Sequence, residues 1–118
     1  MAAVVRFARE QGLRIAPQGT GHNASPLGPL HDTILLKTSR MRAVRIDAEA
    51  RTARVEAGVL WLEVVEAAAE HGLAALAGSS PDVGVVGYSL GGGISWLGRR
   101  HGFAASGRCA AVAGASAS

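Results

Sequence analysis

Cysteine is almost absent from this sequence, aromatic side chains are few, and no long apolar run is present. The single cysteine, Cys109, excludes an intramolecular disulfide and a zinc site built from several thiolates. The four histidines lack the short spacings of metal ligands, so we expect no metal site. No segment approaches the ~20 apolar residues of a membrane span, and no signal peptide pattern precedes the first amphipathic segment. We therefore expect a cytoplasmic protein without a membrane segment.

The composition fits one folded domain. Of 118 residues, 48% are apolar and 18% are charged, which is too hydrophobic for a disordered chain and too short for two domains. The net charge is only +3, the arginines are scattered, and aromatic residues make up 4%. A nucleic-acid surface needs a basic patch with stacking aromatic side chains, so we expect no nucleic-acid partner.

Apolar periodicity places the secondary structure. Trp61, Val64 and Ala68, for example, share one helical face, and apolar residues alternate on both sides of a polar turn at 48–51. This pattern indicates an α+β fold with mixed or antiparallel strands and flanking helices. The expected helices cover 2–11, 60–71 and 94–100, and the expected strands cover 13–17, 33–37 and 73–77, with a hairpin over 43–57.

The last part of the chain differs from the rest. Residues 104–118 are nearly all alanine, serine and glycine, and they show no period. We expect the folded domain to cover 1–103, and we expect 104–118 to be a frayed tail or a weak helix.

Two glycine-rich segments each follow a short apolar run. The first is Pro17-Gln18-Gly19-Thr20-Gly21-His22-Asn23, and the second runs from Gly78 to Gly93. Glycine lets backbone N–H groups approach a ligand without a Cβ in the way, and successive loop N–H groups can bind an anion. The pair predicts a cradle for a phosphate-bearing cofactor, with a purely structural glycine-rich turn as the alternative.

The first segment also matches a dinucleotide-binding fingerprint, G-x-G-x-x-A, over residues 19–24. That fingerprint requires a helix to begin at once, with its N-terminus facing the pyrophosphate. The sequence Ser25-Pro26-Leu27-Gly28-Pro29 follows instead and cannot form a helix. This context excludes a Rossmann fold and leaves loop amides as the phosphate ligands.

The second segment contains a competing motif. Residues 87–91 match G-x-S-x-G, the nucleophile elbow of α/β-hydrolases, with Ser89 as the nucleophile. That triad needs an acidic residue and then a histidine after the serine. No acidic residue follows Asp82, and the glycine triplet at 91–93 is a poor start for the elbow helix. A hydrolase that uses Ser89 is therefore a remote alternative.

Two polar side chains stand out within these segments. His22 lies between Gly21 and Asn23, so we expect it to be exposed beside whatever the loop binds, where it can act as a nucleophile or a covalent anchor. Asp82 either accepts a hydrogen bond from a ribityl or ribose hydroxyl or caps the turn after Pro81. The residues by themselves favour the cap.

Together these residues resemble the FAD-binding (PCMH-type) domain of the vanillyl-alcohol-oxidase family, in its berberine-bridge-enzyme-like branch. Residues 17–24 resemble the first pyrophosphate loop of that family, and residues 54–58 resemble a strand that ends in a glycine. Residues 80–93 are similar to its second loop, and 98–102 are similar to the end of the following helix.

The resemblance implies FAD as the cofactor, carried covalently by His22 through the 8-methyl carbon of the flavin. Some relatives use a cysteine as a second anchor, and Ser80 stands at that position here, so the resemblance implies a single link at most. The cofactor-binding residues that it implies are Gln18, Gly19, Thr20, Gly21, His22, Asn23, Gly78, Ser79, Ser80, Asp82, Val83, Gly84, Gly87, Tyr88, Leu90, Gly91, Gly92 and Gly93.

The family domain has more β-structure before its first helix and is followed by a substrate domain. The resemblance therefore implies an incomplete domain: the FAD-binding portion of a flavin-dependent oxidase or dehydrogenase acting on a C–H or CH–OH group. We assign no catalytic residue, because the general base and the walls around a small-molecule substrate belong to the other domain. The alternative is a non-catalytic or non-functional truncated FAD-binding remnant.

Overall fold

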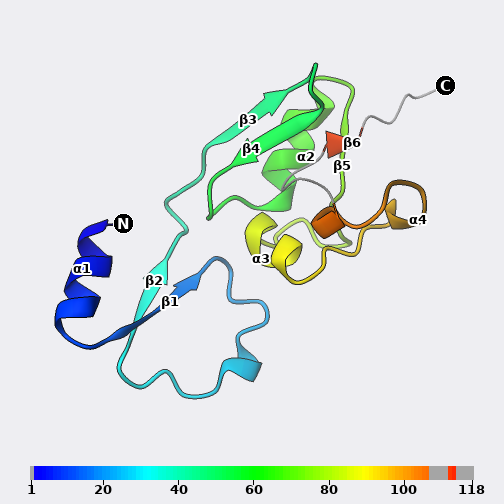
Figure 1. Cartoon of the computed structure of the whole chain (residues 1–118). Helices are drawn as coiled ribbons and strands as arrows, with labels where there is room; N and C mark the ends of the chain where they lie inside the picture. The colour runs from blue at the N-terminus through cyan, green and yellow to red at the C-terminus, as the bar shows by residue number, and fades with distance from the viewer. Residues whose placement is uncertain (1, 107–111, 114–118) are drawn as a thin grey trace.

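The computed structural model describes residues 2–106 and 112–113. The molecule is elongated, with extents of 57 × 27 × 21 Å and a radius of gyration of 16.1 Å. A compact chain of this length would have a radius of about 13–14 Å. The excess reflects two lobes that meet at a narrow junction (Figure 1). We call residues 2–38 the N-lobe and residues 43–106 the C-lobe.

The N-lobe holds one helix and two strands. Helix α1 (Ala2–Glu10) packs on strand β1 (Arg14–Gln18) and buries the side chain of Ala8. β1 pairs in parallel with β2 (Thr33–Lys37) along its whole length. The connection between the strands holds one short 3-10 turn, η1 (Ser25–Leu27), and no α-helix. These elements confirm the predicted helix and strands and give the sheet pairing a parallel component.

The C-lobe is built on the predicted hairpin and the helix that follows it. Strand β3 (Val44–Asp47) pairs antiparallel with β4 (Thr52–Val55), and α2 (Trp61–Ala69) packs against both strands. Alternate residues of the hairpin turn toward α2, as the alternating sequence predicts. The short strand β5 (Ala74–Ala75) follows and also contacts α2.

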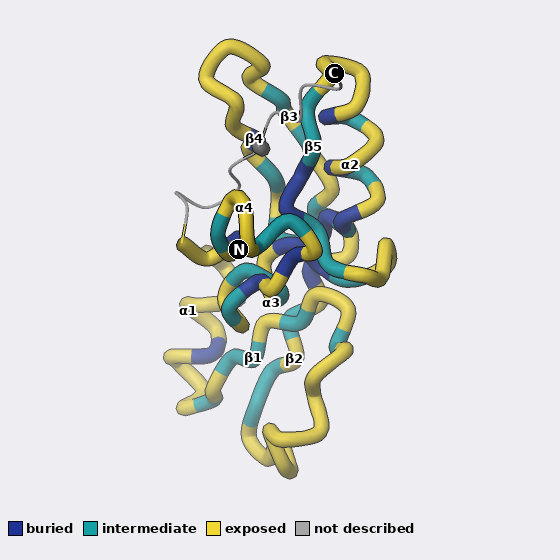
Figure 2. The backbone as a smooth tube through the Cα atoms, turned by 90° about the vertical axis from the view of Figure 1, so that its right-hand side faces the viewer, coloured by how far each residue is buried: buried dark blue, intermediate teal, exposed yellow. Residues whose placement is uncertain are grey.

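The hydrophobic core lies in the C-lobe. Val59, Trp61 and Val64 are 0%, 2% and 1% exposed. Figure 2 shows that the buried backbone gathers around α2, whereas the N-lobe is mostly exposed. Among the described residues, the N-lobe contributes nothing to the core cluster, which comprises Ala53, Val59, Trp61, Val64, Ala68, Ala75, Leu76, Val85 and Ala104.

The sequence predicts a continuous loop for the second glycine-rich segment, but the structure contains a helix there. Residues Val85–Leu90 form helix α3 despite their low helix propensity. The reason is tertiary packing, because Val85 is 2% exposed and its N–H donates to the Val59 carbonyl at 3.0 Å. The ring of Tyr88 also lies edge-on to Trp61, with the centroids 5.2 Å apart. Packing of these two side chains therefore overrides the glycine content.

The prediction of a helix over 94–100 is wrong for residues 94–97, which are not helical. Helix α4 covers only Gly98–His101. Upstream of it, the buried Ser95 accepts a hydrogen bond from the Leu97 N–H at 3.2 Å, which offers the backbone an alternative to a helical turn.

The structure describes two short pieces of the segment that the sequence predicts to be a frayed tail or a weak helix. Residues Ala104–Ser106 form a second 3-10 turn, η2, and Val112–Ala113 form β6, which pairs antiparallel with β5. Ala104 is buried, and its N–H donates to the Gly93 carbonyl at 2.9 Å. The remainder of the expectation for 104–118 lies outside the described residues.

Candidate cofactor-binding site

The first glycine-rich loop leaves the end of β1. The carbonyl of Gln18 accepts the Thr38 N–H at 2.9 Å, which ties the start of the loop to the end of β2. Gly21 then turns the chain with a φ of 78°, a conformation that favours glycine. Beyond this turn, the Nδ1 atom of His22 lies 3.0 Å from the Thr20 hydroxyl, and both side chains are exposed. The loop thus presents its imidazole to solvent, as the sequence predicts.

The start of the second segment is held by α2. The N–H groups of Trp61 and Leu62 donate to the carbonyls of Val83 and Pro81, each at 3.0 Å. Helix starts leave N–H groups without helical partners, and here the 81–83 backbone satisfies two of them. This pairing fixes Asp82 at the molecular surface, between the two carbonyls that accept the bonds.

The two segments meet beside His22 and Asp82. The Nε2 atom of His22 lies 3.9 Å from the Oδ2 atom of Asp82, and the two side chains are 49% and 69% exposed. A Cβ added at Gly84 would lie 3.6 Å from the Thr20 side chain, an ordinary contact distance, so the two segments lie side by side here. Residues about sixty positions apart in the sequence therefore form one solvent-facing junction.

A pocket of about 230 Å³ opens along the second segment. Its walls are Gly78, Ser79, Ser80, Val83, Tyr88 and Ile94. The Tyr88 hydroxyl donates to the Leu76 carbonyl at 3.2 Å and so fixes the ring within the wall. Burial raises the pKa of Tyr88 above its ordinary value of 10.0.

The predicted residues fall into distinct groups. Thr20, His22, Asp82 and Gly84 form the loop junction, and five further predicted residues line the pocket. Gln18, Gly19, Gly21 and Asn23 complete the first loop. Gly87 lies inside α3, Leu90 at its end is 80% exposed, and Gly91, Gly92 and Gly93 follow the helix. The structure therefore assembles the junction and the pocket but leaves the end of α3 at the periphery.

Sequence reasoning missed two residues of this region. Ile94 lines the pocket, whereas the sequence predicted it as the first residue of a helix after the glycine triplet. Thr38 bonds to the first loop from the end of β2. No sequence pattern singles out Thr38, because its partners are backbone carbonyls contributed by distant residues.

The geometry excludes the hydrolase motif. A nucleophile elbow places its serine at a strand-to-helix turn, whereas Ser89 is the fifth residue of the six-residue helix α3. Ser89 cannot occupy the exposed apex that the mechanism requires.

A larger hollow of about 540 Å³ lies elsewhere, on the outer face of the β3–β4 hairpin. Arg45 and Arg54 stand opposite each other there, in register. None of the predicted site residues lines it, so size alone does not identify the candidate site.

Two features are absent from residues 2–106 and 112–113. No helix there has the length and hydropathy to cross a membrane. No group of three histidine, cysteine, aspartate or glutamate side chains is gathered there as metal ligands would be.

Known proteins share this arrangement. Residues 1–113 match the family model described as the FAD binding domain. The chain is similar to (R)-6-hydroxynicotine oxidase of Paenarthrobacter nicotinovorans, with 36% identity over 88% of the chain and 23% of that protein. It is also similar to an FAD-linked oxidoreductase of Trichophyton verrucosum, with 36% identity over 84% of the chain and 18% of that protein.

Solved structures agree with these matches. The 6-hydroxy-D-nicotine oxidase of Arthrobacter nicotinovorans superposes with a TM-score of 0.77 at 36% identity, covering 85% of this chain and 22% of that one. The Bermuda grass isoallergen BG60 gives a TM-score of 0.80 at 32% identity, covering 87% of this chain and 22% of that one. The chain thus spans less than a quarter of the length of these proteins. It belongs to the FAD-binding domain family of flavin-dependent oxidoreductases, and its cofactor is FAD.

Proposed function

We propose that this chain is the FAD-binding portion of an oxidoreductase of the berberine-bridge-enzyme-like type, which oxidises a C–H or CH–OH group of a small molecule. The observation that carries the proposal is the junction at which the His22 and Asp82 side chains approach to 3.9 Å. It joins the two segments that the resemblance assigns to FAD, although they are far apart in the sequence.

The residues present fit FAD. Gly21 in the first loop has a positive φ, a backbone conformation from which anion-binding nests are built. The pocket of about 230 Å³ beside Tyr88 has small residues, Gly78, Ser79 and Ser80, on one wall. Loop amides would hold the pyrophosphate, Asp82 would accept a hydrogen bond from a ribityl or ribose hydroxyl, and the pocket would receive part of the flavin. Bound FAD would supply the two-electron acceptor for the substrate.

We also propose that His22 is the covalent anchor for FAD and the only one. Its side chain is 49% exposed at the loop junction, so a ligand seated there can reach the imidazole. Ser80 lines the pocket where some relatives carry a second anchoring cysteine.

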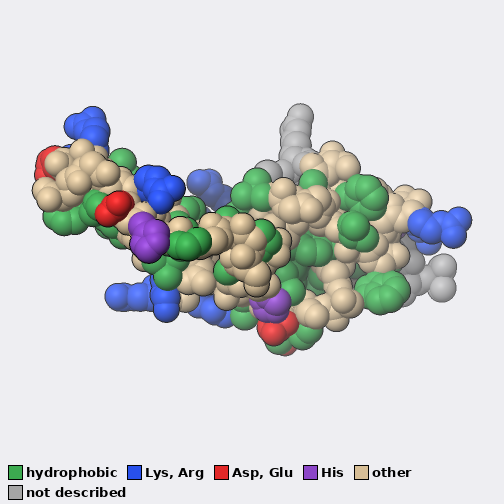
Figure 3. Space-filling model, turned by 90° about the horizontal axis from the view of Figure 1, so that it is seen from below, with side chains coloured by type: hydrophobic (Ala, Val, Ile, Leu, Met, Phe, Trp, Pro, Cys, Tyr) green, Lys and Arg blue, Asp and Glu red, His purple; other side chains and the backbone are tan. Residues whose placement is uncertain are grey.

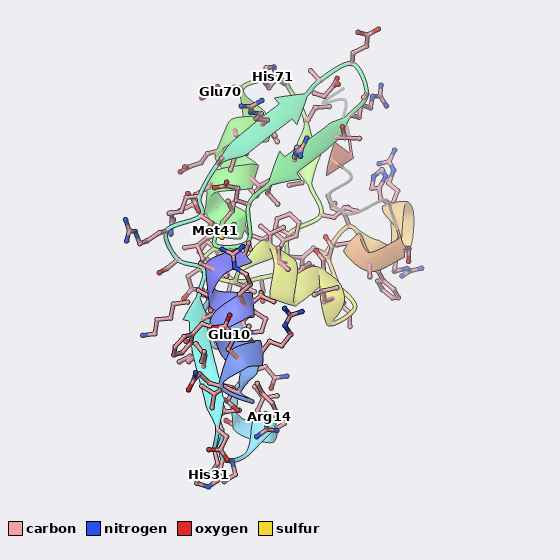
Figure 4. The ribbon with its side chains drawn as sticks, turned by 60° about the vertical axis from the view of Figure 1, so that its left-hand side comes forward. Glu10, Arg14, His31, Met41, Glu70 and His71 are labelled. Atoms are coloured by element: carbon pink, nitrogen blue, oxygen red, sulfur yellow. The ribbon has the colours of Figure 1, made fainter. Side chains whose placement is uncertain are left out.

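The first experiment is precipitation of the purified chain in acid, followed by washing and measurement of flavin fluorescence in the pellet. We expect flavin to remain with the wild-type pellet and to be lost from His22→Ala. His71→Ala is the matched control, because His71 lies at the far end of the C-lobe in Figure 4, and it should retain flavin. A colourless wild-type pellet from protein that still binds FAD would refute the covalent link alone. Absence of any FAD binding would refute the proposed function.

We propose that substrate binding and the catalytic base are contributed by a part of the protein beyond this chain, or by a separate partner. Supporting this, Leu90, Ile94, Trp96 and Phe103 are 80%, 74%, 82% and 50% exposed, and exposed apolar patches mark interaction surfaces. Figure 3 shows hydrophobic side chains exposed across one face, several of them on its right-hand part. The cytoplasm is the proposed location, which cell fractionation would test.

One alternative is an FAD-binding remnant without catalysis. Oxygen uptake with an alcohol or a sugar in the presence of FAD would refute this alternative. Lack of uptake by a chain that binds FAD would support either the remnant or the need for the separate substrate-binding part, and adding that part distinguishes the two.

A further inference from the structure

Thr38 is one of the few buried polar residues, with an exposed fraction of 5%. It follows the last residue of β2, at the point where the chain leaves the N-lobe. A buried hydroxyl without a hydrogen-bond partner is costly, so the partners of this one are informative.

The Thr38 hydroxyl lies between carbonyls from the two lobes. Its Oγ1 atom is 3.1 Å from the Gln18 carbonyl oxygen and 3.0 Å from the Ala57 carbonyl oxygen. A hydroxyl has one proton to donate, so the two acceptors share it. Gln18 begins the first cofactor loop, and Ala57 belongs to the turn between β4 and α2. One side chain therefore ties the first loop to the C-lobe.

The backbone around Thr38 extends this connection. The Met41 N–H donates to the Thr38 carbonyl and the Gly58 N–H donates to the Met41 carbonyl, each at 2.8 Å. The space beside Gly58 is filled by the Thr38 carbonyl, so no side chain fits there. Figure 4 shows Met41 where the two lobes meet.

The path continues to the second cofactor segment. Val59, next to Gly58, accepts the N–H of Val85 at 3.0 Å. Val85 begins α3 and directly follows Gly84, the residue that faces Thr20 across the loop junction. The residues that contact Thr38 therefore connect both loops through a short chain of hydrogen bonds.

We infer that Thr38 is a positioning residue that fixes the two cofactor loops relative to each other, so that FAD meets a cradle that is already formed. The inference rests on the proposed FAD-binding function. Preorganisation strengthens binding because the ligand does not have to order the loops. Since few other contacts hold the slender N-lobe, loss of this hydroxyl should loosen the cradle more than it alters either lobe.

The test compares Thr38→Val, which removes the hydroxyl at similar volume, with Thr38→Ser, which retains it. The matched control is Thr33→Val, because the Thr33 hydroxyl also donates to a carbonyl, that of His31, at 2.9 Å. Figure 4 shows His31 at the far end of the N-lobe. All chains also carry His22→Ala, so that FAD binds reversibly whether or not His22 is the covalent anchor. The readouts are the FAD dissociation constant of the full chain at a temperature where each variant is folded, and the rate of amide hydrogen exchange over residues 18–24.

We expect Thr38→Val to raise the FAD dissociation constant by roughly tenfold, the effect of about 1.4 kcal/mol, and to speed exchange over 18–24 without changing exchange in α2. Thr38→Ser and Thr33→Val should stay within about threefold of the wild type, which is less than half of that effect in free energy. Unchanged FAD affinity in Thr38→Val would overturn the inference, even if its melting temperature falls, since a purely structural role lowers stability alone.

Two further outcomes are decisive. If the wild type does not bind FAD, the proposed function is refuted. Hydrogen exchange without FAD then tests Thr38 alone: faster exchange over 18–24 in Thr38→Val supports the inference, and unchanged exchange overturns it.

If Thr38→Val does not fold, hydrogen exchange in the wild type provides the test. FAD should slow exchange at 18–22 and at 57–59 together, and slowing confined to 18–22 would overturn the inference.

Discussion

At the scale of single residues, the glycines of the second segment have different roles. Gly93 has a φ of 63°, and a Cβ added there would lie 2.6 Å from the Cβ of Ala104. Gly87 lies inside α3 and has no atom within 4 Å of its Cβ position. The pattern of glycines in the sequence predicts closeness to a ligand for both, but the structure explains Gly93 by internal packing.

This difference predicts opposite effects of the same substitution. Gly93→Ala should lower the free energy of unfolding by about 2 kcal/mol or more, since it combines backbone strain with an overlap. Gly87→Ala should raise it by roughly 0.5–1 kcal/mol, because alanine restricts the unfolded chain and favours the helix. Urea denaturation of the two variants checks this, and equal effects would contradict the assigned roles.

Tyr88 gives a prediction about pH. Burial favours the neutral phenol, so the folded chain keeps the proton at pH values where the unfolded chain, titrating near its ordinary value of about 10, releases it. The unfolded state is thereby stabilised, and the free energy of unfolding should fall as the pH rises above that value.

Because Tyr88 is the single tyrosine, phenolate absorbance reports it alone. Its midpoint should lie higher in the folded chain than in urea. Tyr88→Phe should lose this part of the alkaline destabilisation. Equal midpoints in the folded and unfolded chain would show that the ring is not protected in this way.

Some residues of the candidate site could be singled out from the sequence and others could not. His22 and Asp82 were singled out because glycine and proline neighbours mark loops, and loops are where ligand-contacting side chains concentrate. Their mutual approach across the junction could not be predicted, because it depends on how two lobes pack. The contacts of Thr38 could not be predicted either, because they also depend on how the two lobes pack.

At the scale of elements, local pattern was reliable where apolar period and burial agree. α1, α2 and the β3–β4 hairpin follow their predicted ranges to within a few residues at each end. α3 was missed because its helix depends on Val85 and Tyr88 packing against the C-lobe core rather than on propensity. α4 was overextended because Ser95 bonds locally to the backbone.

The start of α2 carries an element-scale prediction. The Glu63 carboxylate accepts a hydrogen bond from the Leu60 N–H at 2.8 Å. It also forms an ion pair with Arg42, in which the Arg42 Nη2 atom lies 2.8 Å from the Glu63 Oε2 atom. Glu63→Ala should lower the free energy of unfolding by about 1 kcal/mol, the usual effect of losing a helix cap. Arg42→Ala should cost less, because the pair is partly exposed.

Thermal or urea denaturation measures both changes. Glu66→Ala, on the exposed side of the same helix, is the control and should stay within about 0.5 kcal/mol of the wild type. If Glu66→Ala is as destabilising as Glu63→Ala, the loss of a negative charge on α2, rather than the loss of the cap, explains the effect.

At the scale of the whole molecule, the lobes are unequally stable. The core cluster lies in the C-lobe, whereas in the N-lobe Ala8 and Thr38 are the described residues with buried side chains. A ligand seated between the lobes therefore has a large effect on the molecule as a whole, because it adds contacts where the chain has few. This is the physical reason to expect the FAD-binding domain to depend strongly on its cofactor.

The measurement that tests the account most directly is the melting temperature of the His22→Ala chain, in which FAD binds reversibly, titrated with FAD. Riboflavin, which lacks the pyrophosphate, is the control. FAD at about 100 times its dissociation constant should add ~2.7 kcal/mol, a rise of roughly 10 °C for a chain of this size. Riboflavin should raise the melting temperature much less. A melting temperature that is indifferent to FAD would contradict the central claim that the two glycine-rich segments form an FAD cradle.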